Sequence, residues 1–249
     1  MTEADARTAE LAQRYGAVRD RLDAAVAAAG RAPGEVELLV VTKYFPAVDV
    51  ARLIGLGARA FGESREPEAS RKIAELRAGP SGDAAVADAV FDMIGSVQSK
   101  KAKSVATWAR AVHSVDRDKV VDALSRGAQA ALDAGERTAP LDVLLQVSLD
   151  GDPARGGVPV GDLSALAEHV TTSAGLRLRG LMVIAPLEGA AEQWMARTAQ
   201  IRERFLATHP EAGVLSAGMS QDLETAVAHG STCVRVGTAI MGRRPIISQ

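Results

Sequence analysis

One lysine of the sequence lies where an apolar run gives way to a proline. Residues Val36 to Val41 are rich in β-branched side chains and have the length of a buried strand, and Thr42-Lys43-Tyr44-Phe45-Pro46 follows them. We expect Lys43 to lie among apolar neighbours, where burial favours a neutral amine over an ammonium group. A neutral amine can attack an aldehyde and form a Schiff base. The position also suits a lysine that extends its charge from a strand end into solvent.

Two later segments place glycine and hydroxyl residues directly after apolar runs. They are Gly218-Met219-Ser220 and Gly237-Thr238. Gly218 lets the backbone approach a ligand closely, and Ser220 is a preferred N-cap residue for a following helix. Backbone N–H groups in such turns and at helix N-termini bind phosphate. Ordinary turns have a similar composition, so it is the presence of both segments together that favours a phosphate site.

Arg235 is a third residue whose position calls for a chemical explanation. It lies in the apolar run Cys233 to Val236, two positions before Gly237, so on a strand the two residues would share a face. A buried arginine needs a partner, either a carboxylate in a structural ion pair or a nitrogen atom of a ligand. An aldehyde that also carries a phosphate would engage both Lys43 and the glycine turns, and pyridoxal 5′-phosphate (PLP) is such a molecule.

Strand and helix patterns alternate about eight times along the 249 residues, as in a parallel sheet with helical crossovers. Short apolar runs predict strands at residues 36–41, 58–61, 89–94, 111–115, 141–149, 176–184, 213–217 and 233–236. An amphipathic helix precedes the first strand and has its apolar face at Leu11, Tyr15, Val18, Leu22 and Val26. The Gly/Ala/Asp-rich stretch from Gly79 to Asp88 is predicted to be a flexible surface loop.

These elements predict one domain, residues 1–249, folded as a (β/α)₈ barrel of the TIM type with an extra N-terminal helix. A doubly wound sheet is the alternative, but it usually carries a glycine-rich fingerprint after its first strand, where this chain has Thr42-Lys43-Tyr44. Barrel enzymes place their sites at the carboxyl ends of the strands, and phosphate often binds after strands 7 and 8. The first and eighth strands of a closed barrel are neighbours, so Lys43 would lie beside the Gly237 turn.

Several segments, in order along the chain, match the motifs of one known family. They are Val41-Thr42-Lys43, Phe61-Gly62-Glu63, Ile94-Gly95 with Gln98, His113-Ser114-Val115-Asp116, Leu145-Gln146-Val147, Arg179-Gly180-Leu181-Met182, Gly218-Met219-Ser220 with Asp222, and the longest, Gly230 to Ile240. Through these segments nearly the whole chain resembles the pyridoxal-phosphate homeostasis proteins, the YggS/PROSC family. The resemblance implies a barrel similar to the N-terminal domain of alanine racemase, with PLP held on a lysine.

The resemblance also implies roles for individual residues. Lys43 would form the Schiff base, and Ser220, Gly237 and Thr238 would hold the cofactor phosphate. Arg235 would face the pyridine nitrogen, and a cation there keeps that nitrogen unprotonated and weakens the ring as an electron sink. Such a site suits storage better than carbanion chemistry. The full set of expected cofactor-binding residues is Lys43, Ser64, Met219, Ser220, Arg235, Gly237 and Thr238.

The chain departs from the family pattern at three places. Ser64 stands where the family usually has Asn after Phe-Gly-Glu, Phe91-Asp92 replaces Trp-His, and Ser148 replaces Asn after Leu-Gln-Val. The shorter side chain of Ser64 puts one contact to the cofactor in question. The lysine and the two glycine turns are intact.

Three functions fit these residues. The resemblance implies a carrier or reservoir in PLP homeostasis, without committed turnover, that passes PLP to the apo forms of PLP-dependent enzymes. The alternative is a racemase-like PLP enzyme that acts on a small amino acid. Alanine racemases add a β-rich domain and a catalytic tyrosine, whereas here Ile240 to Gln249 follow the last strand and the tyrosines are Tyr15, expected in the core, and Tyr44, next to Lys43. A phosphosugar-type barrel enzyme with an aldolase-like Schiff base is the third, but it leaves the motif agreement unexplained.

Composition and charge disfavour other classes. The net charge is −2 with no basic block, so we expect no nucleic-acid surface. The polar residues 1–10 are not typical of a signal peptide and no apolar run has the length of a membrane span, so we expect a cytoplasmic protein. The single cysteine, Cys233, fits a reducing compartment and is expected to be buried rather than nucleophilic. The histidines are scattered along the sequence, which disfavours a metal site. His113 is expected to be a hydrogen-bonded core residue, and the alternative is that it lines the site. A monomer is the default expectation.

Overall fold

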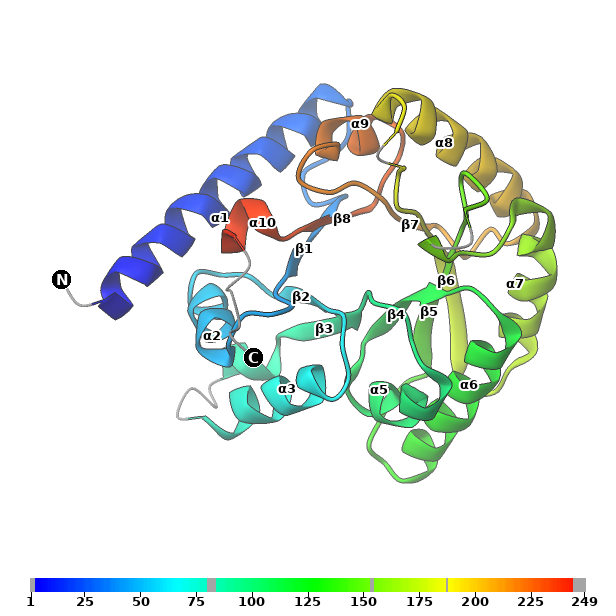
Figure 1. Cartoon of the computed structure of the whole chain (residues 1–249), viewed down its shortest axis with the longest axis horizontal. Helices are drawn as coiled ribbons and strands as arrows, with labels where there is room; N and C mark the ends of the chain where they lie inside the picture. Colours follow the sequence, from blue (N-terminus) through cyan, green and yellow to red (C-terminus); the bar gives the residue numbers. More distant parts are fainter. Residues whose placement is uncertain (1–2, 80–83, 153–154, 187, 244–249) are drawn as a thin grey trace.

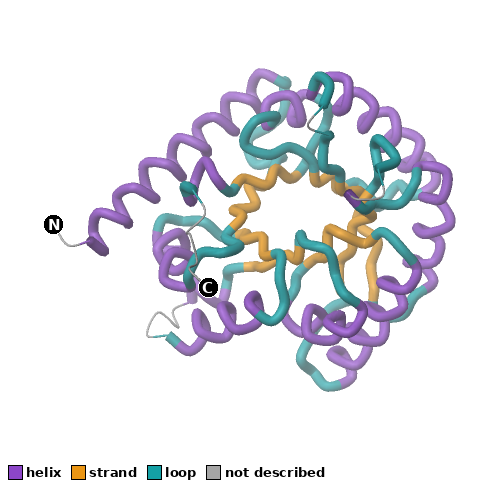
Figure 2. The backbone as a smooth tube through the Cα atoms, in the orientation of Figure 1, coloured by secondary structure: helices purple, strands orange, loops and turns teal. Residues whose placement is uncertain are grey.

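The structure is a computed structural model of the chain and describes residues 3–79, 84–152, 155–186 and 188–243. Its centre is a closed barrel of eight parallel strands that follow one another in chain order (Figures 1 and 2). The strands are β1 Glu37–Val41, β2 Ala60–Glu63, β3 Val90–Met93, β4 Ala111–Val115, β5 Leu141–Gln146, β6 Leu176–Met182, β7 Val214–Ser216 and β8 Cys233–Val236. This topology confirms the (β/α)₈ barrel and excludes the doubly wound sheet.

Helices surround the barrel on the outside (Figure 2). They are α1 Glu3–Ala28, α2 Ala47–Gly55, α3 Glu68–Ala78, α4 Ala84–Ala87, α5 Ala102–Trp108, α6 Asp118–Asp133, α7 Leu163–Thr172, α8 Ala191–Thr208, α9 Leu223–Ala228 and α10 Thr238–Met241, with the 3₁₀ helices η1 Ser99–Lys101 and η3 Val160–Asp162. The predicted extra helix is α1, which packs against α2, α9 and α10 (Figure 1). Its predicted apolar face is buried from Leu11 to Val26. Among the described residues, none of the helices combines the length and apolarity needed to cross a membrane.

Closure of the barrel places the first and last strands side by side. β1 pairs in parallel with β8, with Leu39 opposite Arg235 and Val40 opposite Val236. Because the two strands run in the same direction, the residues that follow them emerge at the same mouth of the barrel. Lys43 therefore lies at the C-terminal mouth together with the Gly237 turn, as the sequence predicts.

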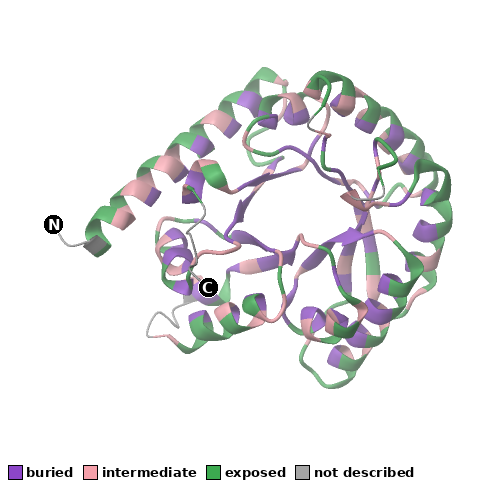
Figure 3. Cartoon of the chain, in the orientation of Figure 1, coloured by how far each residue is buried: buried purple, intermediate pink, exposed green. Residues whose placement is uncertain are grey.

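Both faces of the strands are largely buried (Figure 3), but they differ in chemistry. The outward faces pack with the helices in the main apolar core, where Phe61 and Phe91 stack with ring centroids 5.5 Å apart. The interiors of such barrels are usually filled by branched apolar side chains. Here a small apolar cluster, Leu39, Ala60 and Cys233, shares the interior with buried polar and charged side chains. Buried polar groups cost free energy unless they are paired, so these side chains must find partners inside the barrel.

The structure corrects the sequence predictions in detail. Within the predicted loop 79–88, residues 84–87 form the short helix α4, because an alanine-rich run is a good helix former even between loop residues. Residues 80–83 of that loop lie outside the described residues. β5 ends at Gln146 and β6 at Met182, two to three residues earlier than predicted, because the apolar residues that follow belong to loops at the barrel mouth.

Candidate functional site

A cavity of about 600 Å³ lies at the C-terminal mouth of the barrel. The sequence-predicted residues Lys43, Ser64, Met219, Ser220, Arg235, Gly237 and Thr238 all line it. The remaining lining residues are Val41, Ile94, Gly95, Ile184, Gln221 and Ala239. A cavity of this size, mostly apolar and with a few polar groups, is typical of a small-molecule site.

Lys43 reaches this cavity from the turn that follows β1. The turn is closed by a hydrogen bond from the Phe45 N–H to the Thr42 carbonyl at 3.1 Å. Tyr44 adopts φ +71°, a left-handed conformation that costs a residue other than glycine about 1–2 kcal/mol. Lys43 is half-buried, and its Nζ lies 5.8 Å from the centroid of the Tyr44 ring. It forms no ion pair with any carboxylate of the described residues, so its amine is available to a ligand.

A buried ion pair supports the Lys43 turn from below. Lys72 of α3 donates to the Thr42 carbonyl at 2.9 Å and to Glu63 Oε1 at 2.7 Å. Thr42 Oγ1 donates to the same carboxylate oxygen at 2.7 Å. The side chains of Lys72 and Glu63 are 10% and 3% exposed, so this contact is a structural anchor rather than a surface salt bridge. Sequence reasoning missed Lys72, because nothing in the spacing along α3 shows that it reaches β1.

The loop after β7 carries backbone N–H groups that are not used within the fold. Gly218 has φ +92°, and a Cβ there would lie 2.6 Å from the nearest side-chain atom, so glycine is required. Asp222 occupies the N-cap position of α9 and accepts the Met219 N–H at 2.6 Å, which corrects the prediction that Ser220 caps this helix. In the described part of the chain, the N–H groups of Ser220 and Gln221 have no acceptor.

The loop after β8 completes a pair of adjoining turns. The N–H groups of Gly237 and Thr238 likewise have no acceptor within the described residues. A Cβ on Gly237 would lie 3.2 Å from the Val41 side chain, so this turn packs tightly against the end of β1. Arg21 of α1 donates to the Ser220 carbonyl at 2.6 Å and ties the first turn to the N-terminal helix. Unused N–H groups on adjoining loops, next to two hydroxyl side chains, are suited to bind an anion such as phosphate.

Arg235 is buried beneath the cavity and is 6% exposed. Its Nη1 donates to Ser216 Oγ at 2.6 Å and its Nη2 to the Val183 carbonyl at 2.8 Å. Both acceptors are neutral. Among the described residues, Arg235 therefore has no carboxylate hydrogen-bond partner, and the other partner considered from the sequence was a nitrogen atom of a ligand. Burial lowers the pKa of the Arg235 guanidinium, although arginine keeps its proton in proteins. The site therefore presents a positive charge whose two hydrogen-bond partners among the described residues are neutral.

Ser64 lines the cavity from the end of β2, next to the β3 loop. A Cβ on Gly95 would lie 2.2 Å from the Ser64 carbonyl oxygen, so the Ile94-Gly95 motif is needed for the two loops to touch. Ile184 and Met219 are half-exposed apolar side chains of the same lining. Ile184 could not be predicted as a lining residue, because its position over the cavity depends on where β6 ends.

The remaining titratable candidates have structural roles. His113 is buried and contacts Ser216 and Asp92, which confirms the expectation of a hydrogen-bonded core histidine. Burial raises the pKa of the Cys233 thiol to about 12, so this cysteine is a buried strand residue and not a nucleophile. In the described parts of the chain, no group of three or more His, Cys, Asp or Glu side chains could hold a metal ion.

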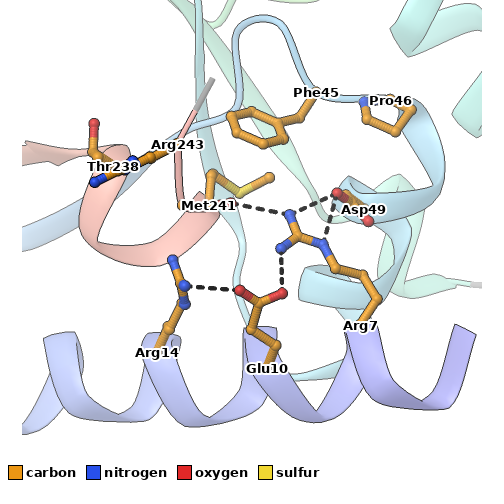
Figure 4. Close-up of a pocket in the computed structure, with 10 residues that line it drawn as sticks. Arg7, Glu10, Arg14, Phe45, Pro46, Asp49, Thr238, Met241 and Arg243 are labelled. Atoms are coloured by element: carbon orange, nitrogen blue, oxygen red, sulfur yellow. Dashed lines mark hydrogen bonds and ion pairs between the residues drawn. The ribbon is translucent and has the colours of Figure 1, made fainter. Parts of the chain in front are cut away.

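A second cavity, of about 680 Å³, lies outside the barrel between α1, the start of α2 and α10 (Figure 4). Arg7 extends into it from α1 and binds Asp49 at 2.8 Å, Glu10 at 2.8 Å and the Met241 carbonyl at 3.1 Å. Arg14 pairs with the other oxygen of Glu10 at 2.8 Å. These charges satisfy one another, so the cluster holds α1 onto the barrel rather than forming an evident ligand site.

Comparison with known proteins places the chain in a family. Residues 14–245 match the family model described as the N-terminal domain of alanine racemase. The chain is 49% identical to the pyridoxal phosphate homeostasis protein of Mycobacterium tuberculosis over 97% of this chain and 96% of that protein. Its identity to the Escherichia coli protein of the same name is 36%, over 94% of this chain and 97% of that protein.

A solved structure agrees in fold. PipY of Synechococcus elongatus, with PLP bound, superposes with a TM-score of 0.77 and is 31% identical, covering 93% of this chain and all of that chain. Such identity over nearly the full length of both proteins indicates common descent. The chain belongs to the family of the pyridoxal phosphate homeostasis proteins.

Proposed function

We propose that this protein binds PLP in the C-terminal cavity, with the cofactor held as a Schiff base on Lys43. The single observation that carries the proposal is that three features line one cavity of about 600 Å³. They are an amine without an ion-pair partner among the described residues, two turns with unused backbone N–H groups, and a buried arginine. The aldehyde, the phosphate and the ring nitrogen of PLP each have a matching group there. When bound, PLP supplies an aldehyde carbon and an aromatic ring that can withdraw electrons.

Each lining residue then has a definite task. Lys43 would condense with the aldehyde, so that a C=N bond replaces the C=O bond and the oxygen leaves as water. Ser220 and Thr238 would donate their hydroxyls to the phosphate beside the unused N–H groups of their loops. Arg235 faces the ring nitrogen, where its positive charge keeps that nitrogen unprotonated and the ring a weak electron sink. Ser64 and Met219 bound the space for the ring.

We further propose that the protein stores or carries PLP and does not turn over a substrate. Among the described residues that line the cavity, Lys43 and Arg235 are the only ones whose side chains titrate or carry charge. Racemisation moves protons on two faces of the substrate and needs a second acid or base, which no lining residue supplies. The recipients of the stored cofactor would be apo PLP-dependent enzymes of the cytoplasm. The names of the homologous homeostasis proteins support this role.

An absorbance titration with PLP tests the proposal. The wild-type protein is expected to develop a visible absorbance band that saturates at one PLP per chain, and Lys43→Ala is expected to lack it. Lys119→Ala, on α6 outside the cavity, is the control and should behave as wild type. A saturating band in Lys43→Ala would overturn the assignment of the lysine.

The racemase-like alternative is decided by a separate assay. The PLP-loaded protein, at the protein concentrations used to assay a racemase, is expected to leave the ratio of L-alanine to D-alanine unchanged over hours. Catalytic racemisation that disappears in Lys43→Ala would show that the protein is an enzyme and not a reservoir.

A further inference from the structure

A chain of buried hydrogen bonds runs from Arg235 down through the barrel. Ser216 Oγ accepts from Arg235 at 2.6 Å and lies 3.0 Å from His113 Nδ1. His113 Nε2 lies 3.2 Å from Asp92 Oδ2. All three side chains below Arg235 are at most 3% exposed. They come from β7, β4 and β3, so the chain crosses the interior of the barrel rather than following one strand.

The lower end of this chain is anchored at the opposite mouth of the barrel. Arg110 donates from Nε and Nη2 to the two oxygens of Asp92, at 2.9 and 2.5 Å. Two further bonds of 2.7 Å join Arg110 to both oxygens of Glu37. Burial alone would raise the pKa of Asp92, but hydrogen bonds from Arg110 and His113 hold it below its usual value. Asp92 is therefore a charged acceptor inside the barrel.

The two ends limit the directions of the hydrogen bonds between them. Arg235 can only donate and an ionised Asp92 can only accept, so His113 carries a proton on Nε2. A hydroxyl oxygen has two acceptor sites, so Ser216 accepts from Arg235 and can either donate to a bare Nδ1 or accept from a protonated one. The first arrangement also uses the Ser216 proton, and it requires the neutral His113 tautomer with its proton on Nε2.

Polar side chains in a barrel interior cost free energy unless each of them is hydrogen-bonded. Buried polar groups must each be paired, and an apolar layer would fill the same space without that requirement. The chain is fully paired, and its upper end is the one arginine that lines the cavity.

We propose that Ser216, His113 and Asp92 are positioning residues that hold the Arg235 guanidinium against the ring nitrogen of the bound cofactor. Through them, the charge state of the N-terminal mouth affects how tightly PLP is held and how it absorbs light. The inference rests on the proposed function, because it assigns these residues to the PLP site. It adds a role for side chains that do not touch the cavity.

The first test needs no cofactor. In ¹⁵N-labelled protein without PLP, the ring nitrogens of His113 are expected to show the neutral tautomer with the proton on Nε2, with His113→Gln identifying the signals. Asp92→Asn replaces an acceptor with an amide and is expected to shift those signals towards the Nδ1–H tautomer. Asp142→Asn is the matched control. Asp142 and Asp92 both line a small cavity of about 130 Å³ at the N-terminal mouth of the barrel, but Asp142 bonds to Arg177. Unchanged His113 signals in Asp92→Asn would refute the directed chain.

The second test measures PLP binding. Ser216→Ala and Asp92→Asn are each expected to raise the PLP dissociation constant about three- to tenfold and to shift the visible band, within the range of couplings between residues of one network. The double variant is expected to bind as the weaker single variant does, whereas independent effects would multiply. Ser216→Ala removes one oxygen atom and keeps the test usable if Asp92→Asn does not fold.

The outcomes separate the two proposals. If wild-type protein does not bind PLP, the proposed function fails. The role of the hydrogen-bond chain in positioning Arg235 against the cofactor then fails as well. In the other case, wild type binds PLP, while Ser216→Ala and Asp92→Asn have the same affinity and spectrum as wild type and Asp142→Asn. The proposed function then stands and the positioning role is wrong.

Discussion

At the scale of single residues, the candidate site consists of side chains that line one cavity and of buried side chains that support them. Lys43 follows a buried strand, and the glycines of the two turns stand directly after β7 and β8. The supporting residues could not be predicted from the sequence, because Lys72 and Ser216 acquire their partners only when distant strands and helices meet. Residues that touch a ligand tend to lie in motifs, whereas those that hold them are set by tertiary packing.

The phosphate turns give a prediction at this scale. Thr238→Ala and Ser220→Ala each remove one hydroxyl donor to a doubly charged phosphate, which is worth about 1.5–3 kcal/mol for a hydrogen bond to a charged group. Each variant is expected to weaken PLP binding by about ten- to a hundredfold, measured by equilibrium dialysis. Thr107→Ala, on the exposed face of α5, is the control. Wild-type affinity in both site variants would remove the phosphate role of these turns.

The anchor beneath Lys43 gives a second prediction. Lys72→Met leaves Glu63 buried without its cation, and breaking a buried pair in this way costs about 3–5 kcal/mol. The free energy of unfolding, measured in urea, is expected to fall by about that amount. The rate of imine formation between Lys43 and PLP is also expected to fall, because the turn that holds Lys43 loosens. A variant that unfolds as wild type does would mean that the pair contributes little to the turn.

At the scale of elements, α1 is fastened to the barrel by Arg7, whose guanidinium joins α1 to α2 and to the last carbonyl of α10 (Figure 4). Arg7→Ala is expected to lower the free energy of unfolding by about 1–3 kcal/mol, because the Asp49 carboxylate, 7% exposed, then keeps only its bond to Arg52. A double-mutant cycle with Asp49→Asn should show coupling between Arg7 and Asp49. Additive effects in that cycle would argue against the fastening role.

The contact between α6 and α7 predicts a pH dependence. His169 of α7 lies 2.9 Å from both Asp118 and Asp122 of α6, and hydrogen bonding to Asp118, with a lesser contribution from Asp122, raises its pKa. A raised pKa in the folded state stabilises the protein below the unfolded pKa of about 6.5, and this gain is lost as pH rises through the folded value. His169→Gln is expected to destabilise by less than about 1 kcal/mol near pH 5 and to have little effect near pH 9, since the contact is partly exposed. An equal loss at both pH values would contradict this.

The elements themselves were mostly predictable, and their boundaries less so. Short, largely apolar runs located all eight strands, because parallel strands buried on both faces have nearly continuous apolar sequence. The helix at Ala84–Ala87 was missed because composition alone does not separate an alanine-rich loop from a short helix. The polar layer inside the barrel was also missed, since single polar residues such as Asp92 and His113 do not reveal which strands face one another.

At the scale of the whole molecule, closure of the barrel places residues that follow the first strand beside residues that follow the last strand. β1 and β8 are nearly two hundred residues apart in sequence but adjacent in the sheet, which is why Lys43 and the Gly237 turn share one cavity. The extent of the domain and a monomeric state stay predictions. Sedimentation of PLP-loaded protein at micromolar concentration is expected to give the mass of one chain, and a concentration-dependent dimer would contradict the monomer.

The most direct test of the central claim is chemical fixation of the cofactor. Borohydride reduces a Schiff base to a stable amine, so PLP-loaded protein can be reduced, digested and mapped by mass spectrometry. We expect one phosphopyridoxyl group per chain, on the peptide that contains Lys43, and none in Lys43→Ala. A stoichiometric label on another lysine, or no label at all in protein that has bound PLP, would contradict the claim that the amine at the mouth of the barrel holds the cofactor.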